Sequence, residues 1–358
     1  MKIFTVIGAR PQFIKSAVVS NAFKQYGLCE FLVHTGQHFD PNMSKIFFDE
    51  MEITKPHAFL GVSGGGHGKM TGEMLIKIED LIVQQKPDWV LVYGDTNSTL
   101  AGALAASKLN VSCAHVEAGL RSDNRSMPEE INRILTDHAS DLLFAPTITS
   151  HQRLLREGIP ENKIILTGDV MLDAALHFGR SAKSSSSIVT DFGLIKEKFA
   201  LCTLHRAENV DNKQRLKWIV NQLNEVSKDL RIILPVHPRL RARLYASQLI
   251  QSLSENIKLI DPVGFLDILC LQMASSVIIT DSGGMQKEAF FQKKPCVTVR
   301  TETEWVELLT GGHNRLAIPE QDSILPKVHD AMNASLDWGI QLYGDGNSSD
   351  IIAKTLQS

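Results

Sequence analysis

Short apolar runs rich in β-branched residues alternate along this chain with segments whose apolar residues recur at helical spacing. One series of runs lies within residues 2–168 and a second within residues 200–318. The runs are KIFTVIG, FLVHTG, WVLVYGD, VSCAHVEAG, LLFAP and IILTG, then ALCTLHR, RIILPVHP, IKLIDP, VIITD, PCVTVR and RLAI. Strands buried on both faces between helices have this composition. The pattern predicts an α/β protein whose parallel sheets are covered by helices.

The clearest helix lies between the second and third of these runs. Its apolar residues fall on one face of a helix: Met74, Leu75, Ile78, Leu81 and Ile82. Pro87 marks its end, because the residue before a proline avoids helical dihedral angles. We expect a crossover helix here.

The polar stretch at residues 181–187 interrupts the alternation, and 358 residues exceed what one core usually organises. We therefore expect two Rossmann-like domains, residues 1–170 and residues 171–342, with a C-terminal helix at about 343–358 that packs back on the first. Ligands of open α/β sheets bind at the carboxyl ends of the strands. We expect two such sheets to face a central cleft.

Composition narrows the class of protein. Hydrophobic residues make up 43% and charged residues 22% of the chain, and the net charge of -3 leaves no basic face for nucleic acid. The N-terminus enters a strand without a signal-peptide pattern, and no apolar run is long enough to span a membrane. We expect a cytoplasmic protein whose separated cysteines stay reduced: Cys29, Cys113, Cys202, Cys270 and Cys296.

A phosphate site is predicted after the run VIITD. Ser282, Gly283 and Gly284 follow that strand and open a helical segment. Backbone N–H groups at a helix N-terminus bind phosphate, and glycine permits close approach. Glu288, one turn later, is placed to accept both hydroxyls of a ribose. The alternative is an ordinary helix cap, although two glycines are unusual in a mere cap.

The first strand ends in IGARPQFIK, which offers Arg10 and Lys15 to the same diphosphate. The three-glycine dinucleotide fingerprint is missing from this turn, so we expect no nicotinamide cofactor. Two plain surface cations are an equally good interpretation of this stretch alone.

Three acids follow strand ends of the first predicted domain. Asp95 ends WVLVYGD, Glu117 ends VSCAHVEAG, and Glu129 follows Pro128 at a helix start. Acids brought to one rim repel one another, which would raise the pKa of at least one and suit it to proton transfer at carbon. Each acid alone is as readily a helix cap or a surface charge.

Histidines end two strands of the second predicted domain. His205 and His237 could bind a diphosphate or relay protons, or each could be satisfied by local backbone. His34 and His38 have a spacing that suggests a metal site, but no third ligand lies nearby. We predict no metal.

A set of blocks, taken together, resembles the non-hydrolysing UDP-N-acetylglucosamine 2-epimerases, a family with a two-domain fold like that of the GT-B glycosyltransferases. The resemblance covers nearly the whole chain. The matching blocks are GARPQFIK, VYGDTNSTLAGALAA, HVEAGLRS, MPEEINRILTDH, TGDVMLDA, TLHRAEN, PVHPR, DPVGFLD, TDSGGMQKEAF and TEWVEL.

The resemblance implies a reaction. A base removes the proton at C2 of a UDP-sugar while UDP leaves C1, and UDP adds back to the glucal-type intermediate after protonation of the other face. No redox cofactor is needed, and UDP-sugar and UDP are the expected ligands of a homodimer. The residues that match the family's catalytic groups are Asp95, Glu117, Glu129, Lys15 and His205. The expected UDP contacts are Arg10, His237, Ser282, Gly283 and Gly284 for the diphosphate, Glu288 for the ribose and the Phe265 segment for uracil.

Two departures concern the sugar. Gln12 and Phe13 stand where the family commonly has Glu-Ala, and only SDNRSM separates Arg121 from Pro128. Both departures resemble the subgroup that converts UDP-2,3-diacetamido-2,3-dideoxyglucuronate into its manno epimer for O-antigen or capsule. In that case Arg125, with Arg121, would pair with a C6 carboxylate, unless Arg125 is a solvated loop cation. The alternatives are a plain UDP-N-acetylglucosamine epimerase, a hydrolysing epimerase, a GT-B glycosyltransferase and a non-catalytic UDP-sugar sensor.

Overall fold

The computed structural model describes residues 1–37 and 54–358, and of Arg10 the backbone alone. The chain divides into two compact units. Unit 1 comprises Met1–His177 and Gln341–Ser358, and unit 2 comprises Phe178–Ile340. The boundary predicted at residue 170 falls at the first residue of α7 (Val170–Ser185), and the division lies further along that helix.

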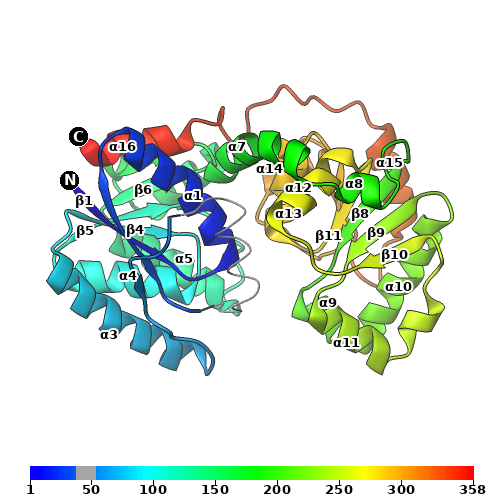
Figure 1. Ribbon diagram of the computed structural model, residues 1–358, viewed down its shortest axis with the longest axis horizontal. Helices are drawn as coiled ribbons and strands as arrows, with labels where there is room; N and C mark the ends of the chain where they lie inside the picture. Colours follow the sequence, from blue (N-terminus) through cyan, green and yellow to red (C-terminus); the bar gives the residue numbers. More distant parts are fainter. Residues whose placement is uncertain (38–53) are drawn as a thin grey trace. The chain divides into compact units, whose positions relative to one another are not determined.

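Unit 1 is built on a seven-stranded parallel sheet with the order β3-β2-β1-β4-β5-β6-β7. Figure 1 labels β1, β4, β5 and β6 of this sheet. β1 pairs with both β2 and β4, so the first strand of the sequence lies inside the sheet. The strands are β1 (Lys2–Ile7), β2 (Cys29–His34), β3 (Ala58–Phe59), β4 (Trp89–Tyr93), β5 (Ser112–Val116), β6 (Leu142–Ala145) and β7 (Ile164–Leu166).

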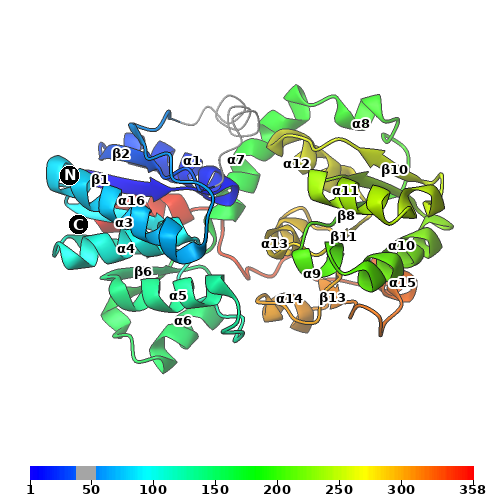
Figure 2. The same ribbon diagram turned by 90° about the horizontal axis from the view of Figure 1, so that it is seen from below.

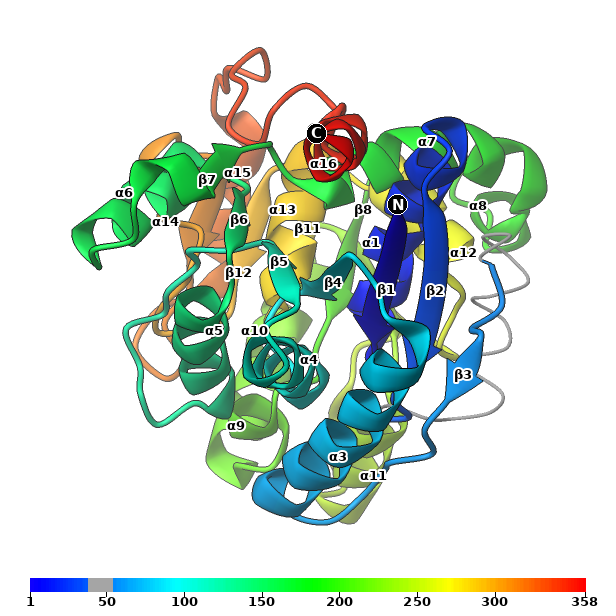
Figure 3. The same ribbon diagram turned by 90° about the vertical axis from the view of Figure 1, so that its left-hand side faces the viewer.

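Helices cover both faces of this sheet, with α3, α4 and α5 on one face and α1 and α16 on the other (Figure 3). The predicted crossover helix is confirmed as α3, which buries Met74, Ile78 and Ile82 and ends before Lys86. The helices are α1 (Arg10–Gln25), α3 (His67–Gln85), α4 (Asn97–Lys108), α5 (Pro128–Ala139), α6 (Ile148–Arg156), a 3-10 turn (Glu161–Lys163), α7 and α16 (Ser348–Gln357).

The C-terminal segment returns to unit 1. Its helix α16 packs against α1, and the Gln357 Nε2 donates to the carbonyl of Tyr26 at 3.2 Å. The carboxylate of Asp173 accepts from the backbone N–H groups of Ser348 and Ser349 at 3.2 and 2.7 Å. These bonds satisfy N–H groups at the start of α16, which have no partner within the helix.

Unit 2 is built on a six-stranded parallel sheet with the order β10-β9-β8-β11-β12-β13. Figure 2 labels β8, β10, β11 and β13 of this sheet. Its strands are β8 (Phe199–Thr203), β9 (Arg231–Pro235), β10 (Ile257–Ile260), β11 (Val277–Thr280), β12 (Cys296–Thr298) and β13 (Asn314–Leu316). Its helices are α8 (Ile188–Asp191), α9 (Ala207–Val210), α10 (Lys213–Ser227), α11 (Pro238–Ala246), a 3-10 turn (Leu249–Ser252), α12 (Phe265–Ala274), α13 (Gly283–Phe291), α14 (Val306–Thr310) and α15 (Ile324–Asn333).

The predicted fold class, α/β with two Rossmann-like domains, is confirmed, because every apolar run quoted above overlaps one strand of a parallel sheet. Sequence reasoning missed β3, which has only two residues and lacks β-branched side chains. Within the described residues, no helix combines the length and the apolar character needed to cross a bilayer.

Candidate active site

The turn after β1 is fixed by the buried side chain of Gln12. Its Oε1 accepts from the N–H groups of Gly8 and Ala9 at 2.7 and 3.0 Å, and its Nε2 donates to the carbonyl of Tyr93 at 2.6 Å. Gln12 therefore ties the β1–α1 turn to the end of β4. A Cβ on Gly8 would lie 2.2 Å from the hydroxyl oxygen of Ser98, so only glycine fits this turn.

Lys15 on α1 and Glu117 after β5 form a buried ion pair at the carboxyl edge of the unit 1 sheet. Their side chains are 8% and 10% exposed. Glu117 has φ of 74°, in the left-handed region that costs a residue with a Cβ about 1–2 kcal/mol. Gly94, at the end of β4, leaves room for the pair, because a Cβ there would lie 3.3 Å from the Glu117 Oε2.

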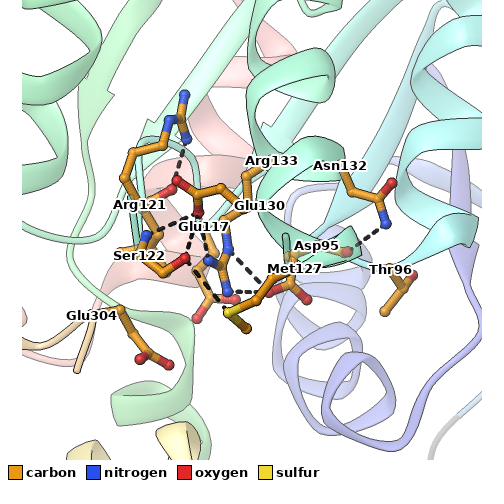
Figure 4. A network of polar contacts seen from close by, with 12 residues as sticks. Asp95, Thr96, Glu117, Arg121, Ser122, Met127, Glu130, Asn132, Arg133 and Glu304 are labelled. Atoms are coloured by element: carbon orange, nitrogen blue, oxygen red, sulfur yellow. Dashed lines mark hydrogen bonds and ion pairs between the residues drawn. The ribbon is translucent and has the colours of Figure 1, made fainter. Parts of the chain in front are cut away.

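Asp95 follows β4 and is held by Arg133 of α5. The Asp95 Oδ2 accepts from Nη2 and Nε of Arg133 at 2.6 and 3.1 Å, and the Asp95 side chain stays 32% exposed (Figure 4). Asn132 donates to the backbone carbonyl of Asp95 at 2.9 Å. Two successive residues of α5 thus orient one acid.

The two acids that begin α5 have different environments. Glu129 is half-buried, whereas Glu130 is buried and accepts from the N–H groups of Ser122 and Asp123 at 2.9 and 3.0 Å. Burial raises the pKa of Glu130, but the hydrogen bonds from Ser122 and the nearby Arg133 outweigh it, so the pKa lies below its ordinary value. Glu130 therefore holds the loop before α5 as a carboxylate.

The expected mutual repulsion of Asp95, Glu117 and Glu129 has to be corrected. Asp95 is paired with Arg133 and Glu117 with Lys15. The premise that the acids are unpaired is wrong for Asp95 and Glu117, and pairing with a cation favours the charged form of a carboxylate.

Behind these acids lies a buried network that sequence reasoning missed. His115 on β5 places Nδ1 2.7 Å from Oδ1 of Asp137 and Nε2 2.7 Å from the carbonyl of Gly94. The other oxygen of Asp137 accepts from Arg121 at 2.8 Å. The available signal was a histidine inside an otherwise apolar buried strand, which needs polar partners.

The two arginines expected at the sugar differ. Arg121 is buried and makes a bidentate pair with Glu157, at 2.9 Å from Nε and 2.7 Å from Nη2, besides its contact with Asp137. These contacts assign Arg121 to the scaffold, against the expectation that it helps to bind a ligand carboxylate. Arg125 is exposed in the loop before α5 and makes no ion pair with any residue in the described part of the chain.

In unit 2 the predicted phosphate cradle lies between β11 and α13. Ser282 is the N-cap of α13 and accepts from the N–H of Met285 at 3.5 Å. Gly283 has no room for a side chain, because a Cβ would lie 2.3 Å from a carboxylate oxygen of Glu304, and Gly284 is exposed. Glu288 accepts from Gln272 at 2.6 Å through one carboxylate oxygen.

Asp281, fully buried at the end of β11, organises the loop that carries His205. It accepts from the N–H groups of His205 and Arg206 at 3.1 Å and faces the His205 Nδ1 at 3.3 Å. Burial raises the pKa of Asp281, but the hydrogen bond and charge of His205 outweigh it and hold the pKa below its ordinary value. The His205 side chain is 49% exposed, and His237 is exposed as the N-cap of α11.

The rings of Phe265 and Phe13 are both buried, so any contact with uracil or sugar would come from other atoms of these two segments. Phe265 is 3% exposed and packs edge to face on Phe178, with ring centroids 5.8 Å apart, so its ring belongs to the core of unit 2. Phe13, expected to border the sugar, is 1% exposed and packs on His34. His38 lies outside the described residues, within which no cluster of metal ligands occurs.

Comparison with known proteins identifies the family of this chain. The UDP-N-acetylglucosamine 2-epimerase family model matches residues 22–357. The chain belongs to this family. It is 52% identical, over 99% of both chains, to the UDP-2,3-diacetamido-2,3-dideoxy-D-glucuronate 2-epimerase of Pseudomonas aeruginosa.

Solved structures of other family members agree. A crystal structure of the Methanocaldococcus jannaschii UDP-GlcNAc 2-epimerase in complex with UDP-GlcNAc and UDP is 43% identical, covers 100% of this chain and 99% of its own, and has a TM-score of 0.92. The Neisseria meningitidis UDP-GlcNAc 2-epimerase bound to UDP-GlcNAc is 32% identical over 100% of both chains, with a TM-score of 0.89.

Membership of the epimerase family makes this protein an isomerase, a UDP-sugar 2-epimerase. The glycosyltransferase and sensor alternatives are thereby set aside. Family membership does not distinguish the sugars, because the chain is also 44% identical to a UDP-N-acetylglucosamine 2-epimerase over 99% of both chains.

Proposed function

We propose that this epimerase inverts C2 of UDP-2,3-diacetamido-2,3-dideoxyglucuronate, giving the manno epimer by elimination and re-addition of UDP. The observation that carries the proposal is the pair of cation-held carboxylates, Asp95 and Glu117, which follow the neighbouring strands β4 and β5. The choice of sugar is supported by the 52% identity to the Pseudomonas aeruginosa enzyme.

Proton transfer at C2 is assigned to the carboxylates. One of them takes the proton from C2 as the C1–O bond breaks, and the electron pair of that bond leaves with UDP. A proton is then delivered to the opposite face of C2, and UDP adds back at C1. Because the two faces are opposite, two groups are required, for which Asp95, Glu117 and Glu129 are the candidates.

UDP departure is assigned to unit 2. Charge that develops on the leaving diphosphate is best stabilised by donors that are already in place. The N–H groups of Gly283 and Gly284 in the first turn of α13 supply such donors, and the hydroxyl of Ser282, the N-cap residue, is a further one. His205, oriented by Asp281, adds a polar group, and His237 and Glu288 are the other proposed UDP contacts in this unit, whereas Arg10 belongs to unit 1.

The C6 carboxylate is assigned to Arg125. It is an exposed cation in the loop that Glu130 fixes, and the described residues offer it no competing acid. A guanidinium matches a carboxylate in a bidentate manner, whereas a neutral hydroxymethyl group leaves it unsatisfied.

The test compares kcat/KM for the uronate and for UDP-N-acetylglucosamine in the wild type, in Arg125→Ala and in the control Arg156→Ala. Arg156 is another exposed arginine of unit 1, at the end of α6. We expect Arg125→Ala to lower kcat/KM for the uronate by about 10- to 100-fold, the effect of a lost charge-assisted hydrogen bond, and to leave the plain sugar unchanged. Equal losses for both sugars, or a wild type that prefers the plain sugar, would refute the assignment.

We also propose that the enzyme works as a cytoplasmic homodimer whose product enters surface polysaccharide synthesis. Sedimentation of the purified protein tests the dimer. Loss of the surface polysaccharide when the gene is deleted, with restoration by the wild type and not by Asp95→Asn, tests the role.

A further inference from the structure

The buried ring of His115 faces two hydrogen-bond acceptors. Its Nδ1 lies 2.7 Å from a carboxylate oxygen of Asp137, and its Nε2 lies 2.7 Å from the carbonyl oxygen of Gly94. A neutral imidazole has one N–H and satisfies one acceptor, whereas an imidazolium donates from both nitrogens. The geometry therefore requires either a charged ring or a protonated Asp137.

Asp137 is present as a carboxylate. Burial raises its pKa, but the hydrogen bond and charge of His115 and the charge of Arg121 outweigh burial, so the pKa lies below its ordinary value. Its second oxygen accepts from Arg121 at 2.8 Å and from the N–H of Gly119 at 3.1 Å. Because Arg121 and Gly119 both donate to Asp137, its carboxylate needs no proton of its own, and both ring nitrogens of His115 are left to donate.

The two contacts of this pair fall on the turns that carry Asp95 and Glu117. Gly94 is held through both of its backbone polar groups, because its N–H donates to the carbonyl of Val116 at 3.0 Å and its carbonyl accepts from His115. Asp137 holds Gly119, two residues after Glu117. Gly119 is itself confined, since a Cβ there would lie 2.5 Å from the carbonyl oxygen of Ser150.

We propose that His115 and Asp137 are positioning residues, in which an imidazolium held by a carboxylate fixes the turn of Asp95 against the turn of Glu117. Both side chains are 0% exposed, so they act through the two turns and not on the substrate. The inference rests on the proposed function, because that function gives Asp95 and Glu117 a shared substrate. It predicts a loss in the chemical step with little loss in binding.

The experiment measures kcat, KM and UDP affinity in His115→Gln, Asp137→Asn and the control Glu157→Gln. Glu157 binds Arg121 from its other edge and touches neither turn. A misplacement of about 1 Å at a reacting group costs about 100-fold, so we expect His115→Gln to lower kcat by about that factor. KM and UDP affinity should stay within about threefold, and Glu157→Gln should keep its kcat although its melting temperature falls.

Asp137→Asn separates charge from shape. Asparagine still accepts from Gly119 and Arg121, and its amide can donate to Nδ1, so a neutral ring can still bind Gly94. We expect kcat to fall about tenfold in this variant, less than in His115→Gln. A folded His115→Gln or Asp137→Asn variant with the kcat of the wild type would overturn the proposal. A fall in kcat in Glu157→Gln as large as that in His115→Gln would also overturn it.

Histidine-selective 15N NMR of the wild type tests the charge independently of any variant's folding. The resonance missing from His115→Gln, or otherwise the one from the most solvent-protected ring, should show protons on both ring nitrogens under the conditions of the kinetic assay. A neutral tautomer there would overturn the inference. If the wild type shows no epimerisation, the proposed function fails. If the wild type is active and the folded variants match it, the positioning role alone fails.

Discussion

Removal of the ammonium group of Lys15 should take one cationic partner away from the buried carboxylate of Glu117. Lys15→Met keeps most of the length and apolar surface of the side chain while it deletes the charge. The side chains of Lys15 and Glu117 are 8% and 10% exposed, so solvent screens the carboxylate only slightly. Breaking a buried pair costs about 3–5 kcal/mol, and the residual exposure places the expected loss in the free energy of unfolding at about 3 kcal/mol.

A double-mutant cycle isolates the pair. About 3 kcal/mol is about 160-fold in the unfolding equilibrium of unit 1. Lys15→Met combined with Glu117→Gln should lose less than the sum of the single losses, with a coupling of about 2 kcal/mol, because neither charge is left without its partner.

Urea unfolding must be followed in unit 1 alone. Trp89 is the one tryptophan of the sequence within unit 1, so fluorine NMR of protein labelled with 5-fluorotryptophan reports that unit separately. A coupling below about 0.5 kcal/mol would refute the reasoning, because it would mean that the two charges are solvated independently.

Three other changes probe the remaining parts of the site. Gly8→Ala places a Cβ 2.2 Å from two hydroxyl oxygens and should lower the free energy of unfolding by about 2–3 kcal/mol. Gly72→Ala, in an open part of α3, should raise the free energy of unfolding by about 0.5–1 kcal/mol. Equal changes for the two variants in urea titrations would contradict the packing argument. Because the pKa of Asp281 is lowered, its contribution to the stability of unit 2 is complete above about pH 4 and is lost as the pH falls through the lowered pKa. In Asp281→Asn the free energy of unfolding of unit 2 should therefore fall less steeply as the solution is acidified. Arg133→Lys replaces two donors to Asp95 with one and should lower kcat about tenfold with little change in KM; unchanged steady-state kinetics would argue against this orienting role.

Much of the fold was predictable because parallel strands covered on both faces are continuous apolar runs. KIFTVIG and VIITD became β1 and β11, and the stripe that includes Met74 and Ile78 became the buried face of α3. β3 was not predictable, since two residues at a sheet edge carry no period.

The candidate site was predicted in its residue types and not in its pairings. Asp95 and Glu117 follow strands, which the sequence indicates directly. The partner of Glu117 lies 102 residues away, on α1, and the pairing depends on β1 and β5 both neighbouring β4. His115 went unassigned because a single histidine in an apolar run does not reveal its partner, and Phe13 was expected at the sugar because sequence alone does not show that its ring packs on His34.

The central claim is that carboxylates of unit 1 exchange the proton at C2 of a UDP-sugar. The most direct measurement incubates the purified enzyme with the diacetamido uronate and with UDP-N-acetylglucosamine, separately, in deuterium oxide, and follows C2 by proton NMR. The account predicts a manno product that carries deuterium at C2, faster with the uronate, and no such product with Asp95→Asn or Glu117→Gln. A manno product that retains its C2 proton, or undiminished exchange in both variants, would contradict it.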